Sequence, residues 1–125
     1  MIRVAINGFG RIGRRVFRLL QSHPTIEVVA INDLADTKTL AHLLKYDSIH
    51  GTLKRTISSD NAHIILDGKT IPVLNKTHPK DLHWTAYAVD IVIEATGKFK
   101  SKSDLMHHIN KGASKVILSV PPSDD

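Results

Sequence analysis

The sequence predicts an α/β fold with a mostly parallel sheet, flanking helices and a small insertion of antiparallel strands. Two observations predict it. Apolar runs alternate with stretches of helical period along the chain, which is typical of parallel strands joined by crossover helices. The first strand and helix are also separated by three spaced glycines. This combination favours one sheet covered by helices, with right-handed crossovers.

The first strand–helix–strand unit spans residues 2–33. Residues 2–6 are an apolar run that we expect to form a buried strand, and residues 8–13 match the pattern G-x-G-x-x-G. A second apolar run, residues 26–31, leads into Asp33, twenty residues after Gly13. Strand, glycines, helix and acid in this order are the fingerprint of a Rossmann-type dinucleotide-binding unit.

Each part of this fingerprint has a mechanical role. Gly8 allows a sharp turn off the strand, Gly10 lets a pyrophosphate approach the backbone, and Gly13 lets the helix pack closely on the strand. We expect a positive φ to be possible at Gly10 as well. Free N–H groups at the helix start form an anion site, and the Asp33 carboxylate is placed to accept hydrogen bonds from ribose hydroxyls.

The following helix is predicted over residues 11–21. Its apolar stripe is predicted from the spacing i, i+4, i+7 and i+8, which selects Ile12, Val16, Leu19 and Leu20. Four arginines lie off this stripe: Arg11, Arg14, Arg15 and Arg18. Arg11 lies inside the phosphate loop, whereas the other three fit either an anionic ligand or an ordinary solvated face.

The middle of the chain predicts one helix and a group of short strands. Asp36 can cap a helix over residues 37–45, whose predicted apolar face is Leu40, Leu43 and Leu44. Residues 52–58 alternate as a strand, and residues 62–66 and 70–74 flank an Asp-Gly turn at 67–68. These strands are the expected antiparallel insertion.

The last part returns to strand–helix–strand order. Leu82 and Trp84 are expected in the core, although Trp84 could instead stack on a ligand. Residues 89–95 form a predicted buried strand that ends at Thr96 and Gly97, where open α/β sheets bind ligands. A helix over 104–110 is expected to be capped by Ser101 and closed by a glycine at 112, and residues 115–120 form a last strand.

Composition indicates one globular domain over residues 1–125. The chain is 42% hydrophobic and 23% charged, and no apolar run approaches the roughly 18 residues of a membrane span. No signal peptide is visible, which favours the cytoplasm. The absence of cysteine excludes disulfides and thiolate chemistry in this chain.

The net charge of +5 raises nucleic-acid binding as an alternative function. However, the basic residues are spread over the whole length and aromatic residues make up only 5%, too few for an obvious base-stacking surface. Pyrophosphate binding explains a basic loop equally well.

Eight histidines raise the possibility of a metal site. His107 and His108 are adjacent and face different directions on a helix, and no H-x-x-x-H or H-E-x-x-H pattern occurs. We therefore expect no metal ion. Glu94 lies at the ligand end of its strand, but a single carboxylate makes no acid/base pair, so a structural or capping role is expected.

Several segments in order resemble phosphorylating glyceraldehyde-3-phosphate dehydrogenases. They are residues 4–14, residues 30–33, residues 44–48 with His50 and Gly51, and residues 94–97. The resemblance covers essentially the whole chain. It implies the NAD-binding domain of a glycolytic oxidoreductase that converts an aldehyde into an acyl phosphate and passes a hydride to NAD.

The resemblance also implies the cofactor-binding residues. They are Asn7, Gly8, Phe9, Gly10, Arg11, Ile12, Asn32, Asp33, Thr77, Thr96, Gly97, Phe99 and Ser119. Arg11 and Ile12 would meet the pyrophosphate, and Asp33 the adenosine ribose. The family often carries an arginine near the adenine, where this sequence has Thr77.

The family's catalytic cysteine and histidine base would both lie beyond residue 125. We therefore expect no catalytic residue here, a catalytic domain outside this sequence, no turnover by the 125-residue chain alone, and a homo-oligomer for the full-length enzyme. Erythrose-4-phosphate dehydrogenases share these motifs, but they tend to have Asn-Glu where this chain has Asn32 and Asp33. A non-catalytic module that senses NAD or binds nucleic acid remains the alternative from a different class.

Overall fold

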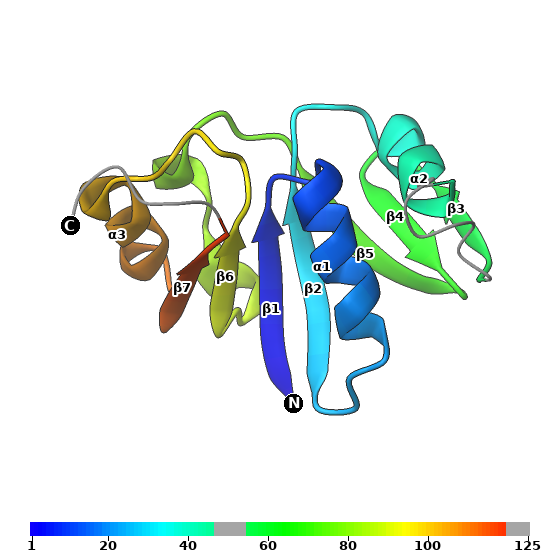
Figure 1. Ribbon diagram of the computed structural model, residues 1–125, viewed down its shortest axis with the longest axis horizontal. Helices are drawn as coiled ribbons and strands as arrows, with labels where there is room; N and C mark the ends of the chain where they lie inside the picture. The colour runs from blue at the N-terminus through cyan, green and yellow to red at the C-terminus, as the bar shows by residue number, and fades with distance from the viewer. Residues whose placement is uncertain (47–54, 120–125) are drawn as a thin grey trace.

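A single twisted sheet of seven strands forms the centre of the computed structural model, which describes residues 1–46 and 55–119. The strand order is β3-β4-β5-β2-β1-β6-β7 (Figure 1). The strands are β1 (Ile2–Asn7), β2 (Ile26–Asn32), β3 (Ile57–Ser59), β4 (His63–Leu66), β5 (Lys69–Leu74), β6 (Ile91–Glu94) and β7 (Lys115–Leu118). This architecture confirms the predicted Rossmann-type α/β fold.

The pairing pattern divides the sheet into a parallel part and an antiparallel part. β1 pairs in parallel with β2 and β6, β6 with β7, and β2 with β5. β3, β4 and β5 pair antiparallel and form the expected insertion. The β4–β5 turn at Asp67 and Gly68 has φ of 51° and 83°, as a type I′ hairpin turn requires.

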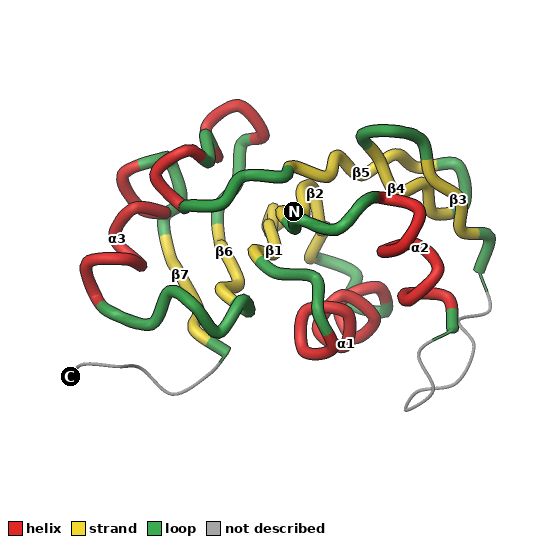
Figure 2. Tube along the Cα trace, turned by 90° about the horizontal axis from the view of Figure 1, so that it is seen from above, coloured by secondary structure: helices red, strands yellow, loops and turns green. Residues whose placement is uncertain are grey.

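One face of the sheet is covered by α1 (Arg11–Gln21) and α2 (Thr37–Lys45) (Figures 1 and 2). Phe17 anchors α1, where it is fully buried and meets Phe9 edge-on at 5.6 Å between ring centroids. Val4 and Ile6 face this cluster from β1. Because Ala5 faces the opposite cluster, β1 is buried on both sides.

The predicted apolar faces of these two helices need correction. Ile12 and Leu19 are 42% and 67% exposed, whereas Gly13 and Phe17 are buried. Gly13 packs directly on the phosphate loop, and this close contact rotates α1 so that Phe17, one turn later, points inward. In α2, Leu43 is 39% exposed in the same way, while Leu40 and Leu44 are buried as expected.

The second face carries α3 (Lys102–Asn110) and two short 3-10 turns, η1 (Pro79–Asp81) and η2 (Trp84–Tyr87). Trp84 and Leu82 are fully buried against Ala5 and Val92 of the sheet, which confirms the prediction that Trp84 belongs to the core. The ligand-stacking alternative for Trp84 is therefore wrong.

Most boundaries lie within two residues of the prediction. Asp36 and Ser101 cap α2 and α3 by accepting hydrogen bonds from backbone amides, although α3 starts at residue 102 rather than 104. β3 covers only the end of the strand predicted over 52–58. Residues 47–54, which include the start of that predicted strand as well as His50 and Gly51, lie outside the described residues. Within the described residues, no helix has the length and apolarity to cross a membrane.

Four carboxylates at the surface have lowered pKa values, which make the stability of the protein depend on pH. They belong to Glu27, Asp36, Asp60 and Asp67, and each has a pKa below its ordinary value. A hydrogen bond from a backbone amide is the main cause at Asp36 and Asp60, and one from a side-chain cation is the main cause at Asp67 and Glu27.

A carboxylate with a lowered pKa in the folded state stabilises the protein above its unfolded pKa of about 4 and loses this effect as the pH falls through the folded value. We therefore expect the stabilisation by these four carboxylates to be lost, and the urea midpoint to fall, as the pH falls below about 4. A matched control is Asp67→Asn, which should reduce the size of this fall. A midpoint that rises on acidification would contradict the assignment.

Candidate functional site: a nucleotide-binding cleft

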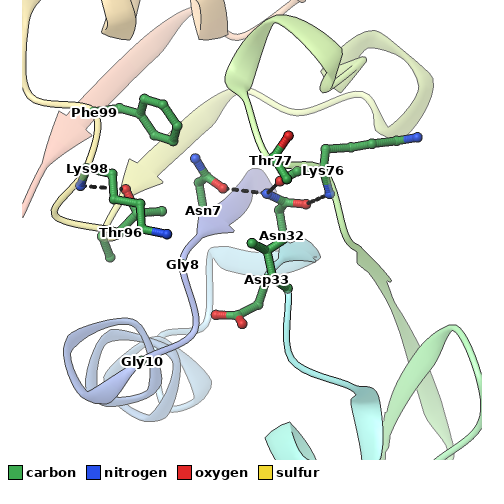
Figure 3. A pocket seen from close by; sticks show the side chains of 12 residues that line it. Asn7, Gly8, Gly10, Asn32, Asp33, Lys76, Thr77, Thr96, Lys98 and Phe99 are labelled. Carbon is green, nitrogen blue, oxygen red and sulfur yellow. Dashed lines mark hydrogen bonds between the residues drawn. The ribbon is translucent and has the colours of Figure 1, made fainter.

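A cleft of about 220 Å³ opens at the carboxyl ends of β1, β2 and β6. Its lining residues are Asn7, Gly8, Gly10, Asn32, Asp33, Leu34, Lys76, Thr77, Ala95, Thr96, Lys98 and Phe99. Figure 3 shows Thr96 and Phe99 on one side, Thr77 and Lys76 on the other, and Asn7 and Asn32 between them. Small-molecule pockets usually have volumes of about 300–1,000 Å³. This cleft is smaller, so it can hold only part of a dinucleotide.

The three glycines differ in what surrounds them. Gly8 has φ of +96°, and a Cβ there would lie 2.7 Å from the Thr96 amide nitrogen. A Cβ on Gly13 would lie 2.1 Å from the carbonyl oxygen of Gly8. Gly8 and Gly13 are therefore required by the turn and by helix packing, as predicted.

Gly10 has a different role. It lines the cleft, and a Cβ built on it meets nothing within 4 Å. Its φ is −77°, so the expectation of a positive φ is wrong, and nothing in the fold itself requires glycine there. The open space beside Gly10 is where a ligand can approach the backbone closely.

The start of α1 adds hydrogen-bond donors without partners in the helix. The first backbone bond of the helix runs from the Arg14 amide to the Gly10 carbonyl, so the three amides before it, at residues 11–13, have no helical acceptor. The N-cap Gly10 supplies no side chain, and the first turn contains no acidic residue. Such an end favours an anion such as a pyrophosphate.

The arginines of α1 are engaged in ways that the sequence did not show. Arg14 donates to the Phe9 carbonyl at 3.0 Å, and Arg18 donates to the Leu44 carbonyl at 2.6 Å. These bonds tie α1 to the phosphate loop and to α2. Both arginines therefore do more than form a solvated basic face.

Asp33 connects the phosphate loop with the end of β2. One carboxylate oxygen accepts a hydrogen bond from the Phe9 amide at 2.7 Å, and the other accepts from the Ala35 amide at 2.9 Å. Asp33 also lines the cleft. Each carboxylate oxygen has a second lone pair, so the side chain can still accept a hydrogen bond from a ligand hydroxyl.

Two asparagines form the floor of the cleft. Asn32 donates to the Asn7 side chain at 2.7 Å and to the Lys76 carbonyl at 3.0 Å, and its own side-chain oxygen accepts from the Lys76 amide at 2.9 Å (Figure 3). Asn7 and Asn32 are 1% and 5% exposed. They fix the loop after β5 to the ends of β2 and β1.

The hydrogen-bonded chain continues from Asn7 to a buried carboxylate. Asn7 donates to Glu94 at 2.7 Å, His108 contacts the same Glu94 oxygen at 2.8 Å, and the amide and hydroxyl of Thr96 both donate to the other oxygen. Glu94 and His108 are both fully buried. The structural role expected for Glu94 is therefore confirmed.

The last member of the chain defines the tautomer of His108. The indole N–H of Trp84 lies 2.9 Å from Nδ1 of His108, and an indole nitrogen can only donate. Nδ1 therefore has the lone pair, and Nε2 carries the proton and donates a hydrogen bond to Glu94. His108 is neutral in this arrangement, and the Glu94 carboxylate accepts four hydrogen bonds.

Eight of the thirteen predicted cofactor residues line the cleft. They are Asn7, Gly8, Gly10, Asn32, Asp33, Thr77, Thr96 and Phe99. The side chain of Phe9 lies in the core, so only its backbone amide faces Asp33. Ser119 donates to the Glu94 carbonyl at 2.9 Å, and it does not line this cleft.

Three more predicted residues, Arg11, Ile12 and Gly97, are exposed just outside the lining. Four lining residues were not predicted: Leu34, Lys76, Ala95 and Lys98. All four are sequence neighbours of predicted residues or of the Thr-Gly pair at 96–97. Adjacency at a strand end was the signal that could have found them.

A parallel sheet whose glycine loop, helix start and acid converge on one cleft defines a dinucleotide-binding domain. The chain belongs to the glyceraldehyde-3-phosphate dehydrogenase family, because the model of its N-terminal domain, "Glyceraldehyde 3-phosphate dehydrogenase, NAD binding domain", matches residues 2–102. The family resemblance and NAD as the cofactor, both predicted from the sequence, are therefore confirmed.

Curated relatives support the same family. The chain is 55% identical to glyceraldehyde-3-phosphate dehydrogenase of Streptomyces coelicolor over 125 residues, and 50% identical to glyceraldehyde-3-phosphate dehydrogenase 1 of Bacillus cereus over 125 residues. It is 49% identical to the enzyme of Geobacillus stearothermophilus over 124 residues. These matches cover 99–100% of this chain but only 37% of each relative.

Proposed function

We propose that the cleft holds NAD with its pyrophosphate over Gly10 and the start of α1, and with its adenosine ribose on Asp33. The observation that carries this proposal is the open space at Gly10 next to helix amides without partners. Thr96 and Phe99 would form one wall for the cofactor, and Thr77 the other. These assignments rest on the geometry of the cleft and on the family of the chain.

We further propose that residues 1–125 form one domain of a phosphorylating aldehyde dehydrogenase. The bound nicotinamide would accept a hydride from an aldehyde held by a separate catalytic domain. The residues of this chain bind and orient the cofactor for that step. Since the sequence contains no cysteine, it offers no thiolate to attack the aldehyde, and the 125-residue chain alone would not turn over.

Glyceraldehyde 3-phosphate is the proposed substrate of the whole enzyme, in keeping with the names of the relatives. A homo-oligomer and a cytoplasmic location are proposed for the same enzyme. The pair Asn32 and Asp33 favours a glyceraldehyde-3-phosphate dehydrogenase over an erythrose-4-phosphate dehydrogenase, which tends to have Asn-Glu at these positions.

The cofactor preference tests the role of Asp33. A 2′-phosphate would bring like charge next to this carboxylate, so NAD should bind more tightly than NADP. In Asp33→Asn the side-chain oxygen can still accept from the Phe9 amide, while the negative charge and the hydrogen bond from the Ala35 amide are lost. We expect NAD affinity to fall by about tenfold, or about 1.4 kcal/mol, and NADP affinity to change little.

Calorimetric titration of both cofactors would measure this preference. The exposed Asp81→Asn, which lies outside the cleft, is the matched control and should leave both affinities unchanged. Equal affinity of the unmodified protein for NAD and NADP would show that the Asp33 carboxylate does not bind the adenosine ribose hydroxyls.

A further inference from the structure

Three potential metal ligands meet next to the cleft without lining it. His78 is the N-cap of η1, while Asp104 and His107 lie three residues apart on one face of α3. One ligand atom from each residue lies within 4.8 Å of the other two, and all three side chains are half-buried. His78 precedes Asp104 by 26 positions in the sequence, so the fold brings it to the two ligands on α3.

Two of these side chains, Asp104 and His107, have lone pairs that no hydrogen bond from a described residue engages, whereas one nitrogen of His78 accepts a hydrogen bond. In the described part of the chain, no hydrogen bond or ion pair engages the carboxylate of Asp104 or the ring nitrogens of His107. The ring of His78 stands edge-on to that of His107 at 5.1 Å between centroids, and edge-on to Phe99 at 5.2 Å. Phe99 thus holds His78 from the side of the cleft.

We propose that His78, Asp104 and His107 bind a divalent transition-metal ion of the zinc class. Two imidazole nitrogens and one carboxylate oxygen form a donor set that suits Zn²⁺, whereas Mg²⁺ and Ca²⁺ prefer oxygen ligands alone. Zinc bonds of about 2.0–2.1 Å in tetrahedral geometry place ligand atoms about 3.4 Å apart. The side chains must therefore close in by about 1.4 Å at most, which half-buried residues can do by small rotations.

Binding at His78 has an identifiable cost. Its Nδ1 accepts a hydrogen bond from the Lys80 amide at 3.1 Å, so Nδ1 has the lone pair in the metal-free protein. The metal either replaces this bond at Nδ1 or binds Nε2 after the proton moves to Nδ1. In both cases the Lys80 amide, which is at the surface, must take a water molecule as its acceptor. Three protein ligands leave a fourth position for water.

Titration of Zn²⁺ against a chromophoric chelator, with chain that carries no affinity tag, tests the proposal. The sequence contains no cysteine, so no thiolate competes for the ion. We expect one Zn²⁺ per chain. His107→Gln should weaken binding by more than the roughly 10–100-fold that follows loss of an outer-shell partner, and Asp104→Asn should also weaken it.

Two matched controls separate this site from other histidines. His83→Gln removes an exposed histidine that caps no helix amide, and His63→Gln removes the exposed partner of Asp60. Both should bind Zn²⁺ like the unmodified chain. Imidazole NMR signals of His78 and His107 should shift on zinc addition while those of His83 stay in place.

The fluorescence of Trp84, the only tryptophan, confirms that each variant is folded. The proposal is overturned if the chain binds no zinc with saturation, if His107→Gln binds it unchanged, or if a control variant loses it. Because binding is measured without NAD, a failure here leaves the proposed cofactor function untouched.

Discussion

Gly10→Val is expected to abolish most NAD binding while the fold is retained. The branched side chain would occupy the space that we assign to the pyrophosphate, since Gly10 lines the cleft and nothing else lies within 4 Å of its Cβ position. With φ of −77°, the backbone accepts valine without strain. We expect affinity to fall by about 100-fold or more, or about 2.8 kcal/mol, and stability by no more than about 1 kcal/mol.

Gly13→Ala is the contrasting variant in this experiment. Its Cβ would lie 2.1 Å from the Gly8 carbonyl oxygen, so α1 must move off the sheet and stability should fall sharply. Calorimetric titration and urea unfolding of both variants would separate the two roles. If Gly10→Val binds NAD normally, the glycine at position 10 serves only the turn, and the pyrophosphate lies elsewhere.

Glu94→Ala is expected to cause a large loss of stability. The substitution leaves donors of the buried Asn7 and His108 unpaired, together with those of the half-buried Thr96. Removing one partner from such a buried network costs about 3–5 kcal/mol. Because Asn7 also holds Asn32, the cleft should loosen and NAD affinity should fall as well.

Fluorescence of Trp84 reports this network directly, since its indole N–H donates to His108. The matched control is Glu27→Ala, which removes a half-buried carboxylate paired with Lys69 at the surface and should cost less than about 1 kcal/mol. Equal losses in the two variants would contradict the importance of the buried network.

The first strand–helix–strand unit could be predicted almost to the residue. Its glycine spacing, its apolar runs and its terminal acid are all local signals, and α1 begins and ends where the pattern indicates. The caps at Asp36 and Ser101 are local in the same sense, because each side chain bonds an amide three residues later.

The rotation of α1 could not be predicted from hydrophobicity. Residues 12, 16 and 19 and residues 13, 17 and 20 both follow a helical period, and glycine contributes no apolar signal. The close packing of Gly13 on Gly8 decides between them, and it buries Phe17 while leaving Ile12 and Leu19 exposed. A steric contact between backbones therefore overrides the more apolar stripe.

The polar network below the cleft could not be predicted from the sequence either. Asn7 and Glu94 are 87 residues apart, and Trp84 and His108 are 24 apart. No spacing rule links such residues, because the parallel pairing of β1 with β6 is what brings the first two together. The histidines His78 and His107 likewise meet only because η1 packs against α3.

Backbone NMR of the isotopically labelled chain during a titration with NAD tests the central claim most directly. If the cleft at the carboxyl ends of β1, β2 and β6 holds the cofactor, the amide signals of Gly8, Gly10, Ile12, Asp33 and Thr96 should shift together and saturate, and NADP should shift them less. Saturating NAD that leaves these amides unchanged, or that shifts only amides away from this cleft, would contradict the account.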